Sequence, residues 1–218
     1  MQIKPIARIK SSYKEKFGTP RQSGLVYSDL SEVIFENEFC FEDFTRGLEE
    51  MSHIWLIFSF HLVNYKEGQS TVRPPRLGGK ERVGIFACRT PHRPNQLGLS
   101  LVKIEVIEKK RIVISGSDLV DGTPIFDIKP YHPQADRPEQ FQSGYISELK
   151  EKKLDVTWDC PQPNELVKHI EDVLAQDPRP SFHENSAEKR EYGLSIQAYN
   201  IRFIYRDGVV IIKQCLKN

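Results

Sequence analysis

The chain has 218 residues, enough for one large domain or for a domain with a smaller companion. Apolar residues make up 39% and charged residues 28%, as in an ordinary soluble globular protein, and the net charge is only +1. The overall charge therefore gives no argument for a polyanionic partner, which only a local patch could attract.

Targeting and redox features of the sequence are few. The longest apolar run, Ile54 to Val63, is shorter than a membrane span and is interrupted by Ser59 and His61. The N-terminal residues MQIKPIARIK lack the apolar stretch of a secretion signal, so we expect a cytoplasmic protein. The cysteines lie far apart without C-x-x-C spacing, which favours reduced thiols over disulfides or a zinc site. They are Cys40, Cys88, Cys160 and Cys215.

The first two-thirds of the chain is predicted to be mainly β. A short amphipathic helix is expected over 41–51, and a central strand buried on both faces over 53–63. Other strand candidates lie between Gly, Pro and Asp residues at 4–10, 24–28, 32–36, 82–89, 99–108, 111–117 and 124–129. Many short strands with few helices favour a β-barrel or a sandwich.

The pattern changes after a polar, proline-containing loop at 133–144. A strand is predicted at 154–158 and an amphipathic helix over 166–174, with Asn164 as N-cap and Asp177-Pro178 as the stop. Asp207-Gly208 between two apolar runs predicts a hairpin. We therefore expect a β-barrel domain over 1–140 and a small α+β domain over 141–218, which is small enough to need the barrel for stability.

The densest charge signal is the segment from Thr71 to Arg93. It holds six cations against the single acid Glu81, a net charge of +5 within 23 residues. Arginine side chains bind phosphates and carboxylates bidentately, so the segment suits an anionic partner, although a solvated loop would explain it too. The six cations are Arg73, Arg76, Lys80, Arg82, Arg89 and Arg93.

Two further stretches carry polar side chains at predicted turns. Arg89 is expected at a strand end, followed by a turn that holds His92, Arg93 and Asn95. Asp118 and Asp121 come after another strand, where carboxylates could accept hydrogen bonds from ribose hydroxyls or an amine, although Asp121-Gly122 is also simply a good turn.

Two basic loops complete the candidates, one with Lys14, Lys16 and Pro20-Arg21-Gln22, the other with Arg179 between two prolines. The second of these could equally be a helix stop and a linker. The sequence lacks a glycine-rich dinucleotide motif, a P-loop and an H-E-x-x-H motif. These patterns alone indicate a β-rich protein that binds a nucleotide or RNA.

The stretches TVRPPRLGG, GIFACRTPHRPNQLGLSLV and DLVDGTPIFDIKPY resemble signature segments of the TsaA-like, or TrmO, family. YKEKFGTPRQSGLV and LAQDPRPSF fit the same family, so the resemblance spans nearly the whole chain. It implies a β-barrel homodimer, S-adenosylmethionine as cofactor and tRNA as partner. The implied reaction is methyl transfer to N6 of threonylcarbamoyladenosine, the modified base just 3′ of the anticodon, without a metal.

The resemblance also implies cofactor contacts. Leu62 stands where the family pattern has glutamine, a change that is harmless if the contact is made by the backbone. The implied contacts are Pro20, Arg21, Gln22, His61, Leu62, Arg89, Leu99, Asp118, Leu119, Val120 and Asp121.

The target N6 is a ureido nitrogen with a delocalised lone pair, so methylation calls for a base that removes its proton. We expect Asp118 or Asp177 as that base, and Arg89 or Arg93 as the cation that holds the threonyl carboxylate or the developing negative charge. Two alternatives are a methyltransferase of the same fold with a small-molecule substrate and a non-enzymatic RNA-binding barrel.

Overall fold

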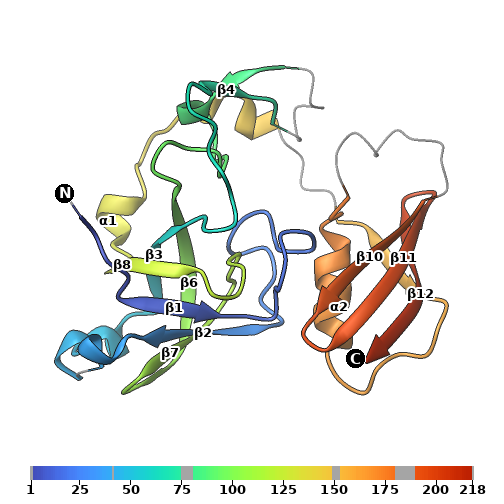
Figure 1. The fold of residues 1–218 in the computed structure, drawn as a ribbon, viewed down its shortest axis with the longest axis horizontal. Helices are drawn as coiled ribbons and strands as arrows, with labels where there is room; N and C mark the ends of the chain where they lie inside the picture. The colour runs from blue at the N-terminus through green and yellow to red at the C-terminus, as the bar shows by residue number, and fades with distance from the viewer. Residues whose placement is uncertain (1, 41, 75–80, 149–152, 180–189, 218) are drawn as a thin grey trace.

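The computed structural model describes residues 2–40, 42–74, 81–148, 153–179 and 190–217. Figure 1 shows a barrel of strands beside a smaller unit, in which a sheet is packed against one helix. No helix in the described part of the chain is long and apolar enough to cross a membrane.

Six strands close into the predicted barrel, in the order β1-β2-β7-β6-β3-β8 with antiparallel neighbours. Their bounds are β1 Ala7–Lys10, β2 Leu30–Phe35, β3 His53–Ser59, β6 Leu97–Glu108, β7 Arg111–Ser115 and β8 Pro124–Pro130. A separate two-stranded ribbon is formed by β4, Thr71–Val72, and β5, Val83–Gly84. Short 3-10 turns lie at Asn37–Phe39, Glu42–Phe44, Leu48–Glu50, Ile85–Ala87 and Gly144–Glu148.

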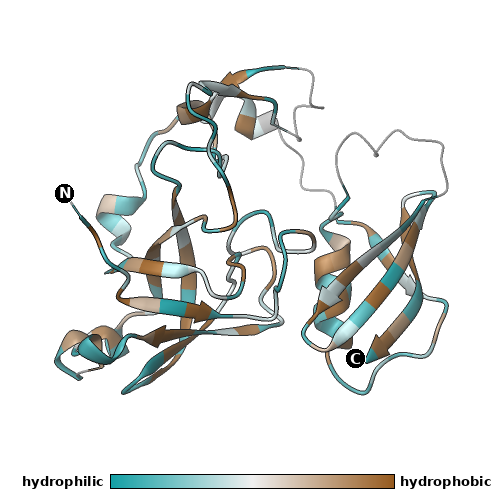
Figure 2. Cartoon of the chain, in the orientation of Figure 1, coloured by the Kyte–Doolittle hydropathy of each residue, from teal (hydrophilic) through white to brown (hydrophobic). Residues whose placement is uncertain are grey.

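The barrel core follows from strand alternation, which Figure 2 shows as alternating hydrophobic and hydrophilic residues. Ile54, Leu56 and Phe58 of β3 point inward and are buried, while the residues between them are only half-buried. The expectation that both faces of this strand are buried is therefore wrong for its outer face, although β3 does lie between two strands, β6 and β8.

Three expected elements differ from the structure. Residues 24–28 form no strand, because Gly24 has a positive φ of 79° and bonds through its N–H to the carbonyl of Gly116 at 2.9 Å. The helix expected over 41–51 is broken into 3-10 turns around Gly47, which also has a positive φ. The strand expected over 82–89 ends at Gly84 and continues as a 3-10 turn, so Arg89 does not lie at a strand end.

The C-terminal unit has a sheet in the order β10-β11-β12-β9, with β9 parallel to β12. The predicted hairpin is confirmed, since Asp207 and Gly208 both have positive φ between β11 and β12. The predicted helix is confirmed as α2, but Leu166 and not Asn164 occupies its N-cap. The bounds are β9 Asp155–Trp158, α2 Val167–Ala175, β10 Glu191–Ile196, β11 Tyr199–Arg206 and β12 Val209–Lys217, and the short α1, Pro133–Asp136, lies in the expected loop.

The hydrophobic core of the C-terminal unit includes residues from the start of the chain. Tyr13 and Val26 are buried in it, and Phe17 and Leu25 pack against it. Tyr13 also forms an isolated antiparallel bridge with Ile196. The segment 11–29 therefore belongs to both units, as the N-terminal loop lying between them in Figure 1 shows.

Candidate active site

The free edge of β6 and the loop after β7 bring the first candidate residues together. β7 pairs with β6 only from Lys103 onward, so within the described chain 97–102 is paired with β3 on one edge alone. Ser100 faces the barrel interior from this stretch, and its hydroxyl donates to Asp118 Oδ1 at 2.6 Å. The carboxylate of Asp118 thus lies against an open strand edge, where backbone groups remain available to a ligand.

The environment of Asp118 favours its neutral form. Burial raises the pKa of this carboxyl above its ordinary value, against the opposing effects of the Ser100 hydroxyl, of backbone N–H groups including that of Ser23, and of the Arg89 charge. A raised pKa brings a carboxylate closer to the range in which it works as a general base.

Arg89 is fixed from the other side by the N-terminal segment. Its Nη1 donates to Gln22 Oε1 at 2.8 Å, and Gln22 Nε2 donates to the carbonyl of Arg21 at 2.7 Å. Ser23, the next residue, contacts Asp118 through its backbone. The motifs around positions 22, 89 and 118, which are far apart in the sequence, therefore meet at one place.

His61 lies just after β3, and Asp121 lies in the turn before β8. The ring Nδ1 of His61 is 3.3 Å from the hydroxyl of Thr123, and burial, followed by the charge of Arg8, lowers the pKa of this imidazole. Asp121 accepts a hydrogen bond from the backbone N–H of Ser11 at 2.9 Å and pairs with Lys14 at 2.7 Å. The Asp121 carboxylate therefore anchors the N-terminal segment to the barrel.

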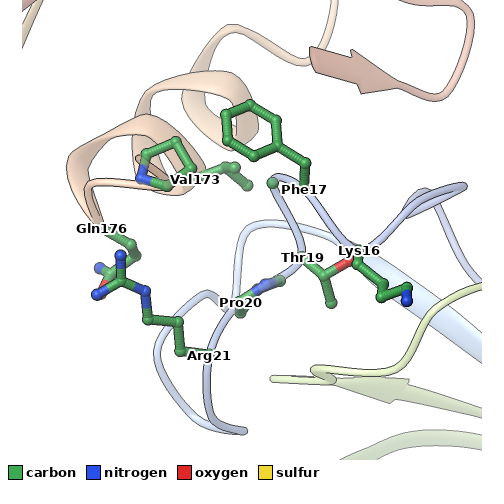
Figure 3. Close-up of a pocket in the computed structure, with 9 residues that line it drawn as sticks. Lys16, Phe17, Thr19, Pro20, Arg21, Val173 and Gln176 are labelled. Carbon is green, nitrogen blue, oxygen red and sulfur yellow. The ribbon is translucent and has the colours of Figure 1, made fainter. Parts of the chain in front are cut away.

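Arg21 reaches toward the C-terminal unit, whereas its neighbour Gln22 binds Arg89. Nη2 of Arg21 donates to the carbonyl of Asp177 at 2.6 Å and to that of Arg179 at 3.1 Å. Figure 3 shows the small cavity beside this contact, of about 110 Å³, where Phe17 and Pro20 face Val173 of α2. Arg21 thus joins the segment that carries Gln22 to the turn after α2.

The DPRP turn itself is tightly held. Asp177 has a positive φ of 50°, and its carboxylate binds the Arg179 guanidinium through two contacts of 2.7 Å. Arg179 is buried and stacks on the ring of Tyr205 at 3.6 Å. The side chain of Asp177 is therefore paired with a cation, whereas Asp118 is hydrogen-bonded to a hydroxyl.

Other expected site residues are placed separately. Arg93 donates to the carbonyls of Ile85 and Cys88, in the 3-10 turn that precedes it and at its end. Leu62 and Leu99 are exposed at 45% and 54%, with Leu99 on the outer face of β6, and Leu119 is buried in the barrel core. A contact between Leu119 and a ligand would therefore use its backbone.

Cations near the site share one property. Lys66, Arg73, Arg82, Arg89 and Arg93 form no ion pair with any carboxylate in the described part of the chain, whereas Lys4, Arg8, Lys10, Lys14 and Arg111 of the barrel all do. Arg76 and Lys80 of the same segment lie outside the described residues. Arg89 acts on the Asp118 carboxylate without forming an ion pair with it, and no described carboxylate forms an ion pair with the other cations, which leaves them able to bind an anionic partner.

Sequence reasoning missed Ser100, the side-chain partner of Asp118. The available signal was a serine at an inward position of a strand otherwise lined by apolar residues, because a buried hydroxyl needs a partner. Across the described residues, no group of three or more His, Cys, Asp and Glu side chains is arranged to hold a metal ion.

Two family models match the chain in order. The model described as the tRNA-methyltransferase O N-terminal domain covers residues 8–137, and the TrmO C-terminal domain model covers residues 145–218. The chain belongs to the TrmO family. The predicted family is therefore confirmed over nearly the full length of the sequence.

Individual TrmO-like proteins agree with this assignment. The chain is 38% identical to a tRNA (adenine(37)-N6)-methyltransferase of Escherichia coli, over 95% of this chain and 94% of the relative. It is 36% identical to a Pseudomonas aeruginosa protein provisionally named an S-adenosylmethionine-dependent methyltransferase, over 93% and 92% of the two chains. A crystal structure of TrmO from P. aeruginosa superimposes with a TM-score of 0.79 at 30% identity, covering 99% of this chain and 98% of that one.

Proposed function

We propose that this protein is an S-adenosylmethionine-dependent tRNA (adenine(37)-N6)-methyltransferase. Its substrate is threonylcarbamoyladenosine, the modified base next to the anticodon. The observation that carries the proposal is the carboxylate of Asp118, held near Arg89 at the free edge of β6 in a chain of this family.

The residues at this edge fit the cofactor's chemistry. S-adenosylmethionine supplies, when bound, an electrophilic methyl group together with a charged amino acid end, ribose hydroxyls and an adenine. The edge of β6 offers backbone donors and acceptors, Asp118 offers a carboxylate, and Arg89 offers a guanidinium without an ion-pair partner among the described residues. We assign cofactor binding to this edge, to the 118–121 loop, to Pro20, Arg21 and Gln22, and to His61 and Leu62.

Asp118 is the proposed general base. Its raised pKa and its position beside the open edge suit the removal of the N6 proton, and Asp177 is the alternative because it lies on the turn linked through Arg21 to the same segment. Arg89, with Arg93 as the alternative, holds the threonyl carboxylate or offsets the negative charge that develops when the proton leaves.

The tRNA backbone is bound by Lys66, Arg73 and Arg82, which form no ion pair with a described carboxylate. The barrel domain, residues 1–140, carries the chemistry, and the C-terminal domain, residues 141–218, supports the tRNA. Two copies form a dimer through the outer face of β6, where Leu97 and Leu99 are exposed side by side. The reaction takes place in the cytoplasm, where tRNA is modified.

The deciding experiment is methyl transfer in vitro, with mass spectrometry of the nucleosides. The purified protein, S-adenosylmethionine and tRNA carrying threonylcarbamoyladenosine should give one added methyl group on that base, whereas tRNA lacking the threonylcarbamoyl group should not react. Calorimetric titration with S-adenosylmethionine should show binding without RNA. Absence of binding would indicate an RNA-binding module, and binding without any reaction on tRNA would point to a small-molecule substrate.

A further inference from the structure

A polar groove lies on the barrel beside the candidate active site. It has a volume of about 590 Å³ and is bordered by the loop after β3, by β4 and by the turn that follows Arg89. Most of its side chains lie outside the cationic segment from Thr71 to Arg93. The side chains that line it are Asn64, Lys66, Glu67, Gln69, Thr71, Arg82 and His92, with Gly68 at the loop's turn.

The groove has two cations, Lys66 and Arg82, against the single carboxylate of Glu67, and it is rich in hydrogen-bonding groups. Lys66 and Arg82 are exposed, and neither forms an ion pair with a described carboxylate. Arg82 is oriented by the bond from its Nε to Thr71 Oγ1 at 2.9 Å, and its two terminal nitrogens form no hydrogen bond with the residues that the structure describes. Asn64, Gln69 and His92 add amide and imidazole groups, which can bind base edges as well as phosphates.

The groove adjoins the proposed cofactor contacts on two sides. Asn64 follows Leu62 by two residues, at most about 7 Å of extended chain, and His92 follows Arg89 by three, at most about 11 Å. Gln96 joins these two loops. Its side-chain amide donates to the backbone carbonyl of Val63, and its backbone carbonyl accepts a hydrogen bond from the N–H of Phe60 at 2.8 Å. An RNA strand lying in the groove would therefore have its next nucleotides at the methylation site.

We propose that this groove binds the single-stranded anticodon loop on one side of the methylated base. This inference rests on the proposed function and adds the surface that selects a loop. A polar, open and cationic surface does not suit an apolar small molecule, whose sites are enclosed and mostly apolar. Single-stranded RNA loops expose phosphates and base edges together, which matches lysine and arginine beside amide and imidazole groups.

The test compares a groove variant with a matched control of equal charge change. The groove variant is Lys66→Ala with Arg82→Ala, and the control is Lys109→Ala with Lys110→Ala, at the exposed turn between β6 and β7. Lys66→Ala and His92→Ala are also tested alone, since Arg82 contributes to the ribbon of β4 and β5. The probes are an anticodon stem-loop carrying threonylcarbamoyladenosine and an RNA duplex of the same length.

We expect the groove variant to bind the stem-loop about 10-fold more weakly, with a salt dependence shallower by one to two phosphate contacts, while duplex binding changes no more than in the control. His92→Ala should raise the KM for the stem-loop. Affinity for S-adenosylmethionine should stay at the parent value in every variant. Failure of the parent protein to bind S-adenosylmethionine or to methylate tRNA would instead overturn the proposed function. The groove proposal is wrong if groove and control variants bind the stem-loop equally, or if the groove variant loses loop and duplex binding to the same extent.

Discussion

Among single residues, Asp118 combines a functional position with a cost to folding. Burial raises the pKa of its carboxyl, so the folded protein binds a proton there more tightly than the unfolded chain does. The contribution of Asp118 to folding free energy therefore falls as pH rises through the interval between the unfolded and the raised folded pKa. Residues retained against such a cost often have a role in a site.

Replacing Asp118 by Asn should lower the methyl-transfer rate constant by about 10²–10⁴-fold without lowering the melting temperature at neutral pH. In the parent, the rate should fall as pH decreases through the raised pKa of Asp118, because only the deprotonated carboxylate accepts a proton. Single-turnover rates across pH measure this, with Asp177→Asn as the comparison. If Asp118→Asn kept near-normal turnover and Asp177→Asn were inactive, the general base would be Asp177 and not Asp118.

Arg21 offers a second residue-scale prediction. Arg21→Ala removes two charge-assisted bonds to the turn after α2 and should cost about 2 kcal/mol of folding free energy. It should also weaken S-adenosylmethionine binding, since Gln22 and its bond to Arg89 lose their support. Arg21→Lys keeps the charge but cannot span both carbonyls as a planar guanidinium does, so it should be intermediate. Urea denaturation and calorimetry measure the two effects, and an Arg21→Ala protein with parental stability would contradict this role.

Among the elements, β6 joins the barrel core to the site through alternating residues. Gly98 faces the interior, where a Cβ atom would lie only 2.3 Å from the ring of Phe58, its cross-strand neighbour. Leu99 follows on the outer face and Ser100 on the inner one. The absence of a side chain at position 98 thus allows the aromatic ring to fill the barrel next to the free edge.

We expect Gly98→Ala to reduce the free energy of unfolding by about 1–3 kcal/mol, because Phe58 has to move within a packed core. Gly84→Ala is the matched control, since no atom of the described residues lies within 4 Å of a Cβ atom there and its φ is −60°. Chemical denaturation of both variants measures the difference. Equal stabilities of the two variants would mean that Phe58 can move to accommodate a side chain at position 98 without loss of stability.

At the scale of the whole molecule, the two units are joined by a polar network as well as by a shared core. His169 of α2 is buried, its Nε2 lies 3.3 Å from the hydroxyl of Ser12, and Ser12 donates to Asp29. Burial lowers the pKa of His169, and the charge of Asp29 only partly opposes this effect. The ring is therefore neutral at physiological pH. The core of the small C-terminal unit is thus completed by the segment 11–29.

The two tryptophans allow cooperativity to be measured. Trp55 lies on the barrel and Trp158 on the C-terminal sheet, so Trp55→Phe and Trp158→Phe each leave one reporter. Because Tyr13 and Val26 complete the second core, both reporters should show coincident denaturation midpoints. An early transition at Trp158 alone would mean that the C-terminal unit unfolds independently.

Association with tRNA should depend steeply on salt, because Lys66, Arg73 and Arg82, which pair with no described carboxylate, would replace counterions on phosphates. Filter binding between low and physiological ionic strength measures the slope of log affinity against log salt. With about three phosphate contacts we expect a slope of about −2, the single-strand value. Affinity that does not change with salt would contradict a backbone contact by these residues.

The sequence by itself determined the features that depend on nearby residues. Periodicity located the long strands of the barrel, the helix α2 and the hairpin at Asp207-Gly208, because backbone alternation and turn chemistry act over a few positions. Signature segments identified the family. The same local reasoning failed where glycine conformation interrupts a pattern, as at Gly24 and Gly47.

Only the tertiary structure decided how distant segments meet. The bonds from Ser100 to Asp118, from Arg89 to Gln22 and from Arg21 to the carbonyl of Asp177 join positions 18, 67 and 156 residues apart. Barrel closure and the shared second core set these contacts, and they also decide which cations find a carboxylate and which stay available. No local pattern encodes such pairings, because they depend on how whole elements pack and not on neighbouring residues.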